Sequence, residues 1–411
     1  MGASATASPC GATFGSSLFA RPCGLTALVC GFAALPSIAR PVASLLCGGF
    51  AACRTQDLDQ RISPLIFYFN LPFMIDFRSD TVTRPSQGML AAMQKAPLGD
   101  DVFGEDPLTN ALERETAQRF GLEAGLFCPS GTMANQIAIK NHSSAPGSLI
   151  CDQRSHVYLY EVGGISFHSG LSPILTQDEA GLMQPSSLLA ALPNPHDLHK
   201  ANAQILVLEN TCNKGGGSCY ELDQMQALSQ LARENNLAVH LDGARLANAI
   251  VAKGYSEKEV GACFDSISIC LSKGLGAPIG SLLLGSADFI RSARRLRKLF
   301  GGGMRQTGQL AAAGQYALDQ QWDRLAEDHE KAAELGQLIA QQAYCEELAP
   351  IQTNIVLFRL KEELSPQAFL DQLAAKGLLA VPFGGQWIRL VTHLDISAAD
   401  MQQAKQILRS I

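Results

Sequence analysis

Two side chains that could act together, Asp242 and Lys273, each end an apolar run of the sequence, LAVHLD and ISICLSK. Such runs predict buried strands. The spacing fits one strand–helix–strand crossover, so a parallel sheet would bring the two strand ends together. A lysine is costly to bury unless its amine is neutral or covalently used. With an aspartate that can hold a protonated ring nitrogen, it supplies the minimum parts of a pyridoxal 5'-phosphate (PLP) enzyme.

Taken singly, each residue also has an ordinary structural explanation. Lys273 would extend to the surface, and Asp242 would cap the helix that follows it. The pair is harder to explain in this way because Arg245, Ser272 and Gly274 flank it. We therefore interpret the two residues as a Schiff-base lysine and a partner for a pyridinium nitrogen.

A set of ordered motifs makes this interpretation specific. Between Asp76 and Asp395 the chain carries, in this order, SDTVTRPS, GDDVFGEDP, PSGTMANQ, LENT, LDGARLANA, SKGLGAPIGS, GGGMRQTG and RLVTHLD. The set resembles the low-specificity L-threonine aldolases, which are PLP enzymes of the aspartate aminotransferase fold type, fold type I. The resemblance covers nearly everything from Met74 to the C-terminus, and it rests on the order of many motifs that are individually weak.

The resemblance implies a carbon–carbon lyase that cleaves L-threonine and L-allo-threonine, and other β-hydroxy-α-amino acids, with glycine and acetaldehyde as the products from threonine. Cleavage requires the Cα–Cβ bond to stand roughly perpendicular to the cofactor ring. A planar arginine fork on the substrate carboxylate sets this orientation. By motif match, that arginine is Arg389, and Ser79 and Arg245 are its neighbours. Without the match, Arg389 would equally be a strand-surface ion pair.

Cofactor and catalytic residues follow from the same match. PSGTMAN opens a helix whose N–H groups and dipole suit a phosphate, although Ser130 alone would be an ordinary N-cap. The residues matched to cofactor binding are Gly131, Thr132, His156, Asp242, Arg245, Lys273, Lys298 and Arg305. Lys298 and Arg305 match residues that reach a neighbouring subunit, which implies a homo-oligomer, a tetramer built as a dimer of dimers.

Two histidines complete the expected catalytic set with Lys273 and Asp242. His156 matches the histidine that stacks on the cofactor ring, and His199 matches one that approaches the substrate's β-hydroxyl. A neutral imidazole suits removal of that hydroxyl proton. We expect the two to share the contact, so that neither is a sole base and both β-epimers react. His240, on the face of Asp242, is either a second contact or a satisfied core histidine.

Two positions depart from the family pattern. Cys212 follows Glu209–Asn210–Thr211 where relatives carry a histidine, and Phe103 stands where many carry tyrosine. We expect activity with altered kinetics. Two other functions compete: a different PLP enzyme of this fold, such as an aminotransferase or β-eliminating lyase, and a silent PLP-binding regulator. Retention of the matched catalytic residues argues against the second.

Composition narrows the remaining possibilities. A net charge of −6 argues against nucleic acid or an anionic membrane as partner. The 12 cysteines form no CxxC pair or zinc-ligand spacing, so we expect no metal and a reducing compartment, the cytoplasm. The apolar stretch from Gly24 to Cys53 is interrupted by Pro36, Arg40 and Pro41, which argues against a membrane span.

The chain is predicted to divide into three parts. Residues 1–73 lack lysine and carry no acidic residue before Asp57, so they are expected to be a dispensable extension or, alternatively, an organellar transit peptide. Residues 74–320 alternate strand and helix, which predicts an α/β domain with a mostly parallel, seven-stranded-type sheet covered on both faces. Residues 321–411 predict a smaller α+β domain, in which a long helix at 322–342 is followed by short strands at 354–358, 379–382 and 387–391.

Overall fold

A seven-stranded sheet forms the centre of the computed structural model, which describes residues 74–411. The predicted extension of residues 1–73 lies outside the described residues. The strands are parallel except β8, which runs antiparallel to both of its neighbours. In spatial order they are β2 (Ala124–Cys128), β8 (Ser281–Gly285), β7 (Ser266–Cys270), β6 (Ala238–Gly243), β5 (Ala203–Glu209), β3 (Gly147–Asp152) and β4 (Leu171–Thr176).

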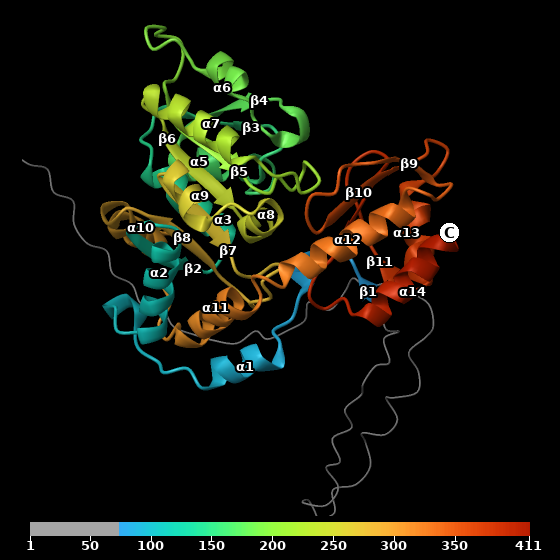
Figure 1. The fold of residues 1–411 in the computed structure, drawn as a ribbon. Coiled ribbons are helices and arrows are strands. Elements are labelled where there is room, and N and C mark those ends of the chain that lie inside the picture. The colour runs from blue at the N-terminus through green and yellow to red at the C-terminus, as the bar shows by residue number, and fades with distance from the viewer. Residues whose placement is uncertain (1–73) are drawn as a thin grey trace, which may run out of the picture. The chain divides into compact units, whose positions relative to one another are not determined.

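Helices cover both faces of this sheet (Figure 1). Within β5, Ile205 and Val207 pack on one face, and Leu206 and Leu208 pack on the other. The first face is covered by α3 (Gly131–Asn141), α5 (Gly164–Ser169) and α10 (Ala287–Leu299). The second is covered by α2 (Pro107–Arg119), α6 (Pro185–Ala191), α7 (Leu222–Glu234), α8 (Leu246–Lys253), α9 (Glu257–Cys263) and α11 (Gly308–Gln320). The predicted mostly parallel sheet, covered on both faces, is confirmed.

A smaller antiparallel sheet forms around a second core. Its strands, in spatial order, are β12 (Val381–Pro382), β13 (Trp387–Val391), β10 (Ile355–Leu360) and β9 (Cys345–Leu348). Helices α12 (Leu325–Ile339), α13 (Pro366–Ala375) and α14 (Ala398–Arg409) pack against it. Ile75 and Phe77 join this second core, so it draws on both ends of the described chain.

The N-terminal segment connects the two cores. Its first strand, β1 (Ile75–Asp76), pairs in parallel with β11 (Leu378–Leu379). A single 3-10 turn (Asp80–Val82) and helix α1 (Gln87–Gln94) then carry the chain to the large sheet (Figure 1). Phe77 is fully buried and accepts the main-chain N–H of Val391. The following residues are thereby fixed beside β13.

Two elements differ from the sequence prediction. The helix predicted over 322–342 begins only at Leu325, because Trp322 is buried against Phe120 and Arg119 of the large domain core and the chain turns there. The strand predicted over 379–382 is divided between β11 and β12, which pair in two different sheets. None of the helices within residues 74–411 is long and apolar enough to cross a membrane.

Candidate active site

A cavity of about 410 Å³ lies at the carboxyl-terminal edge of the large sheet. Strands β5, β6 and β7 end at this edge, where open α/β sheets bind their ligands. The cavity is lined by Ser79, Thr81, His156, Tyr160, Asn213, Arg245, Lys273, Val381, Pro382, Phe383 and Arg389. It therefore gathers five of the residues singled out in the sequence, namely Ser79, His156, Arg245, Lys273 and Arg389.

Lys273 lies three residues after the end of β7 and lines the cavity. Its Nζ donates to the Cys270 Sγ at 3.4 Å, a weak acceptor. Its main-chain carbonyl accepts the Thr83 hydroxyl at 3.0 Å, which fixes the backbone of the loop. The amine is thus positioned without a strong partner of its own, as a group that must react with a carbonyl compound requires.

Asp242 is buried near the end of β6, within a polar network. Its Oδ2 accepts the Asn135 side-chain N–H at 2.9 Å, and its Oδ1 accepts the Ala244 N–H at 3.1 Å. Asn135 also bonds His240 Nε2 at 3.2 Å, and His240 Nδ1 lies 2.8 Å from Ser266 Oγ. Burial lowers the pKa of His240 to about 3, so its ring is neutral. His240 is both a satisfied core histidine and a link to Asp242 through Asn135.

His156 begins the short helix α4 (His156–Leu159) and forms one wall of the cavity. Its main-chain N–H donates to Glu209 Oε2 at 2.7 Å, and its Nδ1 lies 3.0 Å from Glu161 Oε1. Glu161 is buried and also accepts N–H groups of Asn135 and Gln136. Burial lowers the pKa of His156, but the hydrogen bond to Glu161 and the negative charges of Asp242, Glu161 and Glu209 together outweigh it, so the pKa is raised.

His156, Glu161 and Asp242 each offer a ligand atom, and these atoms lie within 4.8 Å of one another. Such a group could also hold a metal ion. However, Glu161 already accepts three hydrogen bonds and Asp242 two. The arrangement is therefore better suited to fixing the imidazole and the Asp242 carboxylate than to surrounding a cation.

Arg245 is buried and is held by an equally buried carboxylate, Asp80. The guanidinium donates to Asp80 through Nε at 2.8 Å and Nη2 at 2.7 Å, a bidentate ion pair. Asn354 adds a third donor at 3.3 Å. Burial raises the pKa of Asp80, but the positive charge and hydrogen bonds of Arg245 outweigh it and hold that pKa well below its ordinary value.

Arg389 extends from β13 toward Arg245 across the same cavity. Its Nη1 donates to Asn213 Oδ1 and its Nη2 to the Arg78 carbonyl, each at 2.9 Å. Its Nε is buried and has no partner among the described residues. The guanidinium lies 4.9 Å from the centre of the Phe383 ring. Burial and the positive charge of Arg245 lower the pKa of Arg389 to about 10, which marks a cation that lacks an anion.

The N-terminus of α3 lies beside this constellation. Ser130 caps the helix by accepting the Met133 N–H at 3.2 Å, so the N–H groups of Gly131 and Thr132 have no acceptor within the helix. A Cβ atom on Gly131 would lie 2.5 Å from the Cys270 Sγ, the same atom that accepts from the Lys273 amine. The N-terminus of α3 and the Lys273 amine therefore both lie next to the Cys270 thiol.

Six of the predicted site residues do not line this cavity, and three of them, His199, Lys298 and Arg305, also lie away from Lys273. His199 is exposed on the connection between α6 and β5, where its main-chain N–H donates to Asp197. Lys298 lines a separate cavity on α10. Arg305 is mostly exposed and pairs with Asp100 at 3.1 Å. The structure of this chain alone thus brings none of the three to Lys273.

Several residues of the site were not singled out from the sequence as site residues. Asp80, Asn213 and Glu161 lie in loops or short turns, where no periodic pattern marks them. Glu209 was noted only as part of LENT, yet it ends β5 opposite Asp242 of β6. Burial and the charge of Asp242 raise the pKa of Glu209 to about 7. Glu209 could have been found from the sequence, because it is a carboxylate at the end of an apolar strand, the same feature that indicated Asp242.

The two departures from the family pattern lie away from the cavity lining. Cys212 is buried, and its main-chain N–H pairs with the Ser218 carbonyl in a tight turn after β5. Burial raises the pKa of the Cys212 thiol well above its ordinary value, so it remains protonated. Phe103 is 75% exposed. In the turn that contains Cys212, the residue that lines the cavity is its neighbour Asn213.

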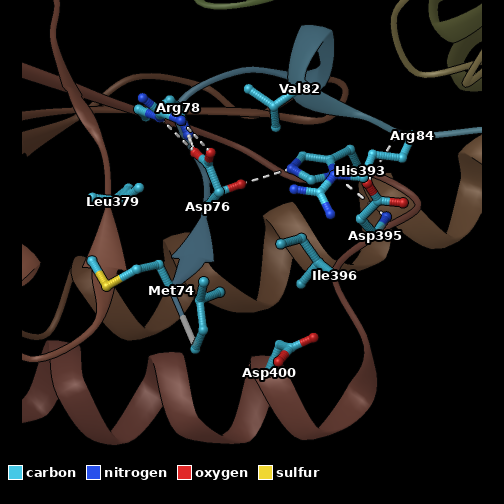
Figure 2. Close-up of a pocket in the computed structure, with 11 residues that line it drawn as sticks. Met74, Asp76, Arg78, Val82, Arg84, Leu379, His393, Asp395, Ile396 and Asp400 are labelled. Atoms are coloured by element: carbon cyan, nitrogen blue, oxygen red, sulfur yellow. Dashed lines mark hydrogen bonds and ion pairs between the residues drawn. The ribbon is translucent and has the colours of Figure 1, made fainter. Parts of the chain in front are cut away.

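A larger cavity of about 590 Å³ lies elsewhere, beside β1 (Figure 2). Its polar groups already pair with one another: Arg78 with Asp76, His393 with the Asp76 carbonyl, and the Arg84 N–H with Asp395. These bonds hold the segment that brings Ser79 to the smaller cavity and Asp80 to the Arg245 guanidinium. Figure 2 therefore shows a structural support rather than a second constellation of free reactive groups.

Comparisons with known proteins agree on one family. A family model described as beta-eliminating lyase matches residues 76–363. The chain is 43% identical to the low specificity L-threonine aldolase of Escherichia coli K12 over 332 residues, which are 80% of this chain and 97% of that protein. It is 40% identical to the probable low-specificity L-threonine aldolase 2 of Arabidopsis thaliana over 80% of this chain and 94% of that one. Among solved structures, the Leishmania major threonine aldolase has the same fold, with a TM-score of 0.72 at 20% identity, over 82% of this chain and 99% of that chain.

Proposed function

The chain belongs to the low-specificity L-threonine aldolases of the beta-eliminating lyase family, and from this premise we propose its reaction. It cleaves L-threonine and L-allo-threonine to glycine and acetaldehyde, and it cleaves other β-hydroxy-α-amino acids in the same way. The enzyme is a PLP-dependent carbon–carbon lyase of fold type I. In the cell, this reaction degrades β-hydroxy amino acids and supplies glycine.

The residues at the sheet edge fit PLP. Lys273 offers an amine without a strong partner, and Asp242 offers a carboxylate that two neutral donors fix in place. The open N–H groups of Gly131 and Thr132 suit the phosphate. The buried Ser281 Oγ has no partner among the described residues and lies 3.5 Å from the place of a Gly131 Cβ, so a polar group beside the helix start would satisfy it. When bound to Lys273, PLP supplies the electron sink that carbon–carbon cleavage needs.

The observation that carries the substrate assignment is the state of Arg389. The side chain is half-buried, its buried Nε lacks a partner within the described chain, and a second guanidinium, that of Arg245, faces it. Because burying an unpaired cation is costly, the site is stabilised by an anion that binds between Arg389 and Lys273. The α-carboxylate of an amino acid meets this requirement. Ser79 lines the same cavity and is the further candidate donor to that carboxylate.

His156 is the proposed acceptor of the β-hydroxyl proton, directly or through a water. Glu161 engages its Nδ1, which leaves Nε2 for the cavity side of the ring. The resemblance also assigned His199 to this task. Its exposed position adds no support, so the proposal relies on His156. A single hydroxyl contact of this kind gives little discrimination between the two β-epimers.

Homo-oligomer formation is part of the proposal, with a dimer of dimers as the expected assembly. Lys298 and Arg305 lie away from the cavity of their own chain, as residues that serve a neighbouring subunit would. Several large apolar side chains, among them Phe103, Phe167 and Leu299, are more than two-thirds exposed and would be covered by such contacts. The cytoplasm is the proposed compartment, because every cysteine within residues 74–411 is a free thiol.

The decisive assay uses purified protein with PLP and each threonine epimer. We expect acetaldehyde and glycine in equal amounts, with acetaldehyde followed by NADH oxidation through alcohol dehydrogenase. Lys273→Ala serves as the inactive control. Release of ammonia with an oxo acid would identify a β-eliminating lyase instead. Transfer of the amino group to an added oxo acid would identify an aminotransferase.

A further inference from the structure

Glu209 holds two walls of the cavity without lining it. It is buried at the end of β5, and each of its carboxylate oxygens accepts one main-chain N–H. Oε2 accepts from His156 at 2.7 Å and Oε1 accepts from Asn213 at 2.9 Å. Both donors belong to residues that line the cavity. One carboxylate therefore fixes two backbone segments that are far apart in sequence.

Asn213 extends this connection to the substrate side of the cavity. Its Oδ1 accepts from Arg389 Nη1 at 2.9 Å, and that arginine comes from the smaller sheet. The hydrogen bonds thus run from His156 through Glu209 and Asn213 to Arg389. The path joins the proposed proton acceptor to the proposed carboxylate ligand, and Glu209 belongs to this path without lining the cavity.

The charge of Glu209 lowers the stability of the folded chain. Asp242 is its partner in register on β6, so two buried carboxylates lie side by side. Two like charges on neighbouring strands in register repel each other, and burial raises the free energy of both ionised forms. No ion pair to Glu209 offsets this within residues 74–411.

We propose that Glu209 is a positioning residue that sets the distance between His156 and Arg389 and thereby controls how tightly the substrate carboxylate is held. This inference rests on the proposed function, because it assigns Arg389 to that carboxylate. Both main-chain N–H groups need an acceptor, and only the ionised carboxylate supplies two. A glutamine offers one acceptor oxygen and turns its NH₂ group toward the other N–H.

A matched control lies on the neighbouring strand. Asp152 ends β3, is buried, and also accepts two main-chain N–H groups, from Arg154 at 2.8 Å and Asp178 at 2.9 Å. Neither donor lines the cavity. Asp152→Asn therefore loses the same kind of contact as Glu209→Gln, without the connection to Arg389.

The experiment measures glycine binding to the holoenzyme at pH 8.5, where Glu209 is ionised, from the change in the cofactor spectrum. Glu209→Gln and Asn213→Ala are each expected to raise the Kd for glycine by about tenfold, the cost of about one hydrogen bond to a charged group. The double variant is expected to stay within about threefold of either single variant, since both changes break one path. Asp152→Asn should leave the Kd within about twofold of wild type.

A second readout does not depend on the loaded enzyme. In the apo-protein, hydrogen exchange at the main-chain N–H of His156 and of Asn213 should accelerate together in Glu209→Gln but not in Asp152→Asn. An unchanged glycine Kd in Glu209→Gln, or multiplicative effects of the Glu209 and Asn213 changes, would overturn the inference. If wild-type holoenzyme neither binds glycine nor cleaves threonine, the proposed function fails first.

Discussion

The ion pair between Asp80 and Arg245 gives the most direct quantitative test of the site. Asp80→Asn keeps the size of the side chain but removes its negative charge. In the wild type, the carboxylate accepts Nε and Nη2 of Arg245 at 2.8 and 2.7 Å, and both side chains are buried. The asparagine offers one acceptor oxygen and points its NH₂ group at the second guanidinium N–H.

The expected loss follows from these contacts. One charge-assisted hydrogen bond disappears, which alone costs about 1.5–3 kcal/mol. The guanidinium is then left buried without a counter-ion, facing Arg389 and near Lys273. Removing one partner of a buried pair typically destabilises a protein by about 3–5 kcal/mol, and we expect Asp80→Asn to fall in this range. Solvent screening changes this little because Arg245 is only 6% exposed.

The assay is urea unfolding of the apo-protein at fixed protein concentration, followed by circular dichroism. Asp328→Asn is the matched control: Asp328 is fully buried and binds Arg324 in the same bidentate way, at 2.8 and 2.9 Å, but neither residue lines the cavity. Arg324 is partly exposed, so a smaller loss of about 1–3 kcal/mol is expected there. Glycine binding to the holoenzyme should weaken only in Asp80→Asn.

The pH dependence supplies an independent check. The folded-state pKa of Asp80 lies well below the ordinary value of 3.8, so its stabilisation is fully present above that value and is lost as the pH falls through the folded pKa. The stability difference between wild type and Asp80→Asn should therefore be constant from pH 8 to about pH 5 and should narrow only in more acidic solution. A difference under about 1 kcal/mol at pH 7 would refute the reasoning, as would one that vanishes between pH 7 and 5.

Four further predictions test the remaining assignments. Lys273→Ala should lose the visible absorbance of bound PLP and the cleavage activity while its far-ultraviolet circular dichroism stays unchanged; borohydride label on another lysine of the wild type would contradict the assignment. Arg389→Lys should lower kcat/KM by about a hundredfold, mostly through KM, since a lysine has no planar fork, and Arg359→Lys on β10 serves as the unaffected control. His156→Phe should lose most of kcat and the acidic limb of the kcat/KM profile; because the wild-type pKa of His156 is raised, that limb should lie above the 6.5 of an ordinary imidazole, and a limb unchanged in the variant would assign it elsewhere. Removing residues 1–73 should leave stability and kcat/KM unchanged, because the composition changes after residue 73 and the family motifs begin near Met74, and loss of folding in the truncated chain would disprove this.

The sequence itself determined the strands that carry the site. β5, β6 and β7 are apolar runs that end in a polar or small residue, and burial on both faces of a parallel sheet selects this pattern. Because parallel strands end at one edge, Asp242 and Lys273 were expected near each other from spacing alone, and both lie at that edge. The motif order then identified the family, which the comparisons confirm.

The tertiary structure alone decided how the charges pair. Nothing in the local pattern shows that Asp80 neutralises Arg245, that Asn213 holds Arg389, or that Glu209 bonds two distant main-chain N–H groups. Such partners lie on loops and turns separated by long stretches of chain, where no periodicity constrains a side chain. Periodicity encodes which face of an element is buried, whereas the pairing of buried charges depends on where the loops bring them, and only the folded chain specifies that.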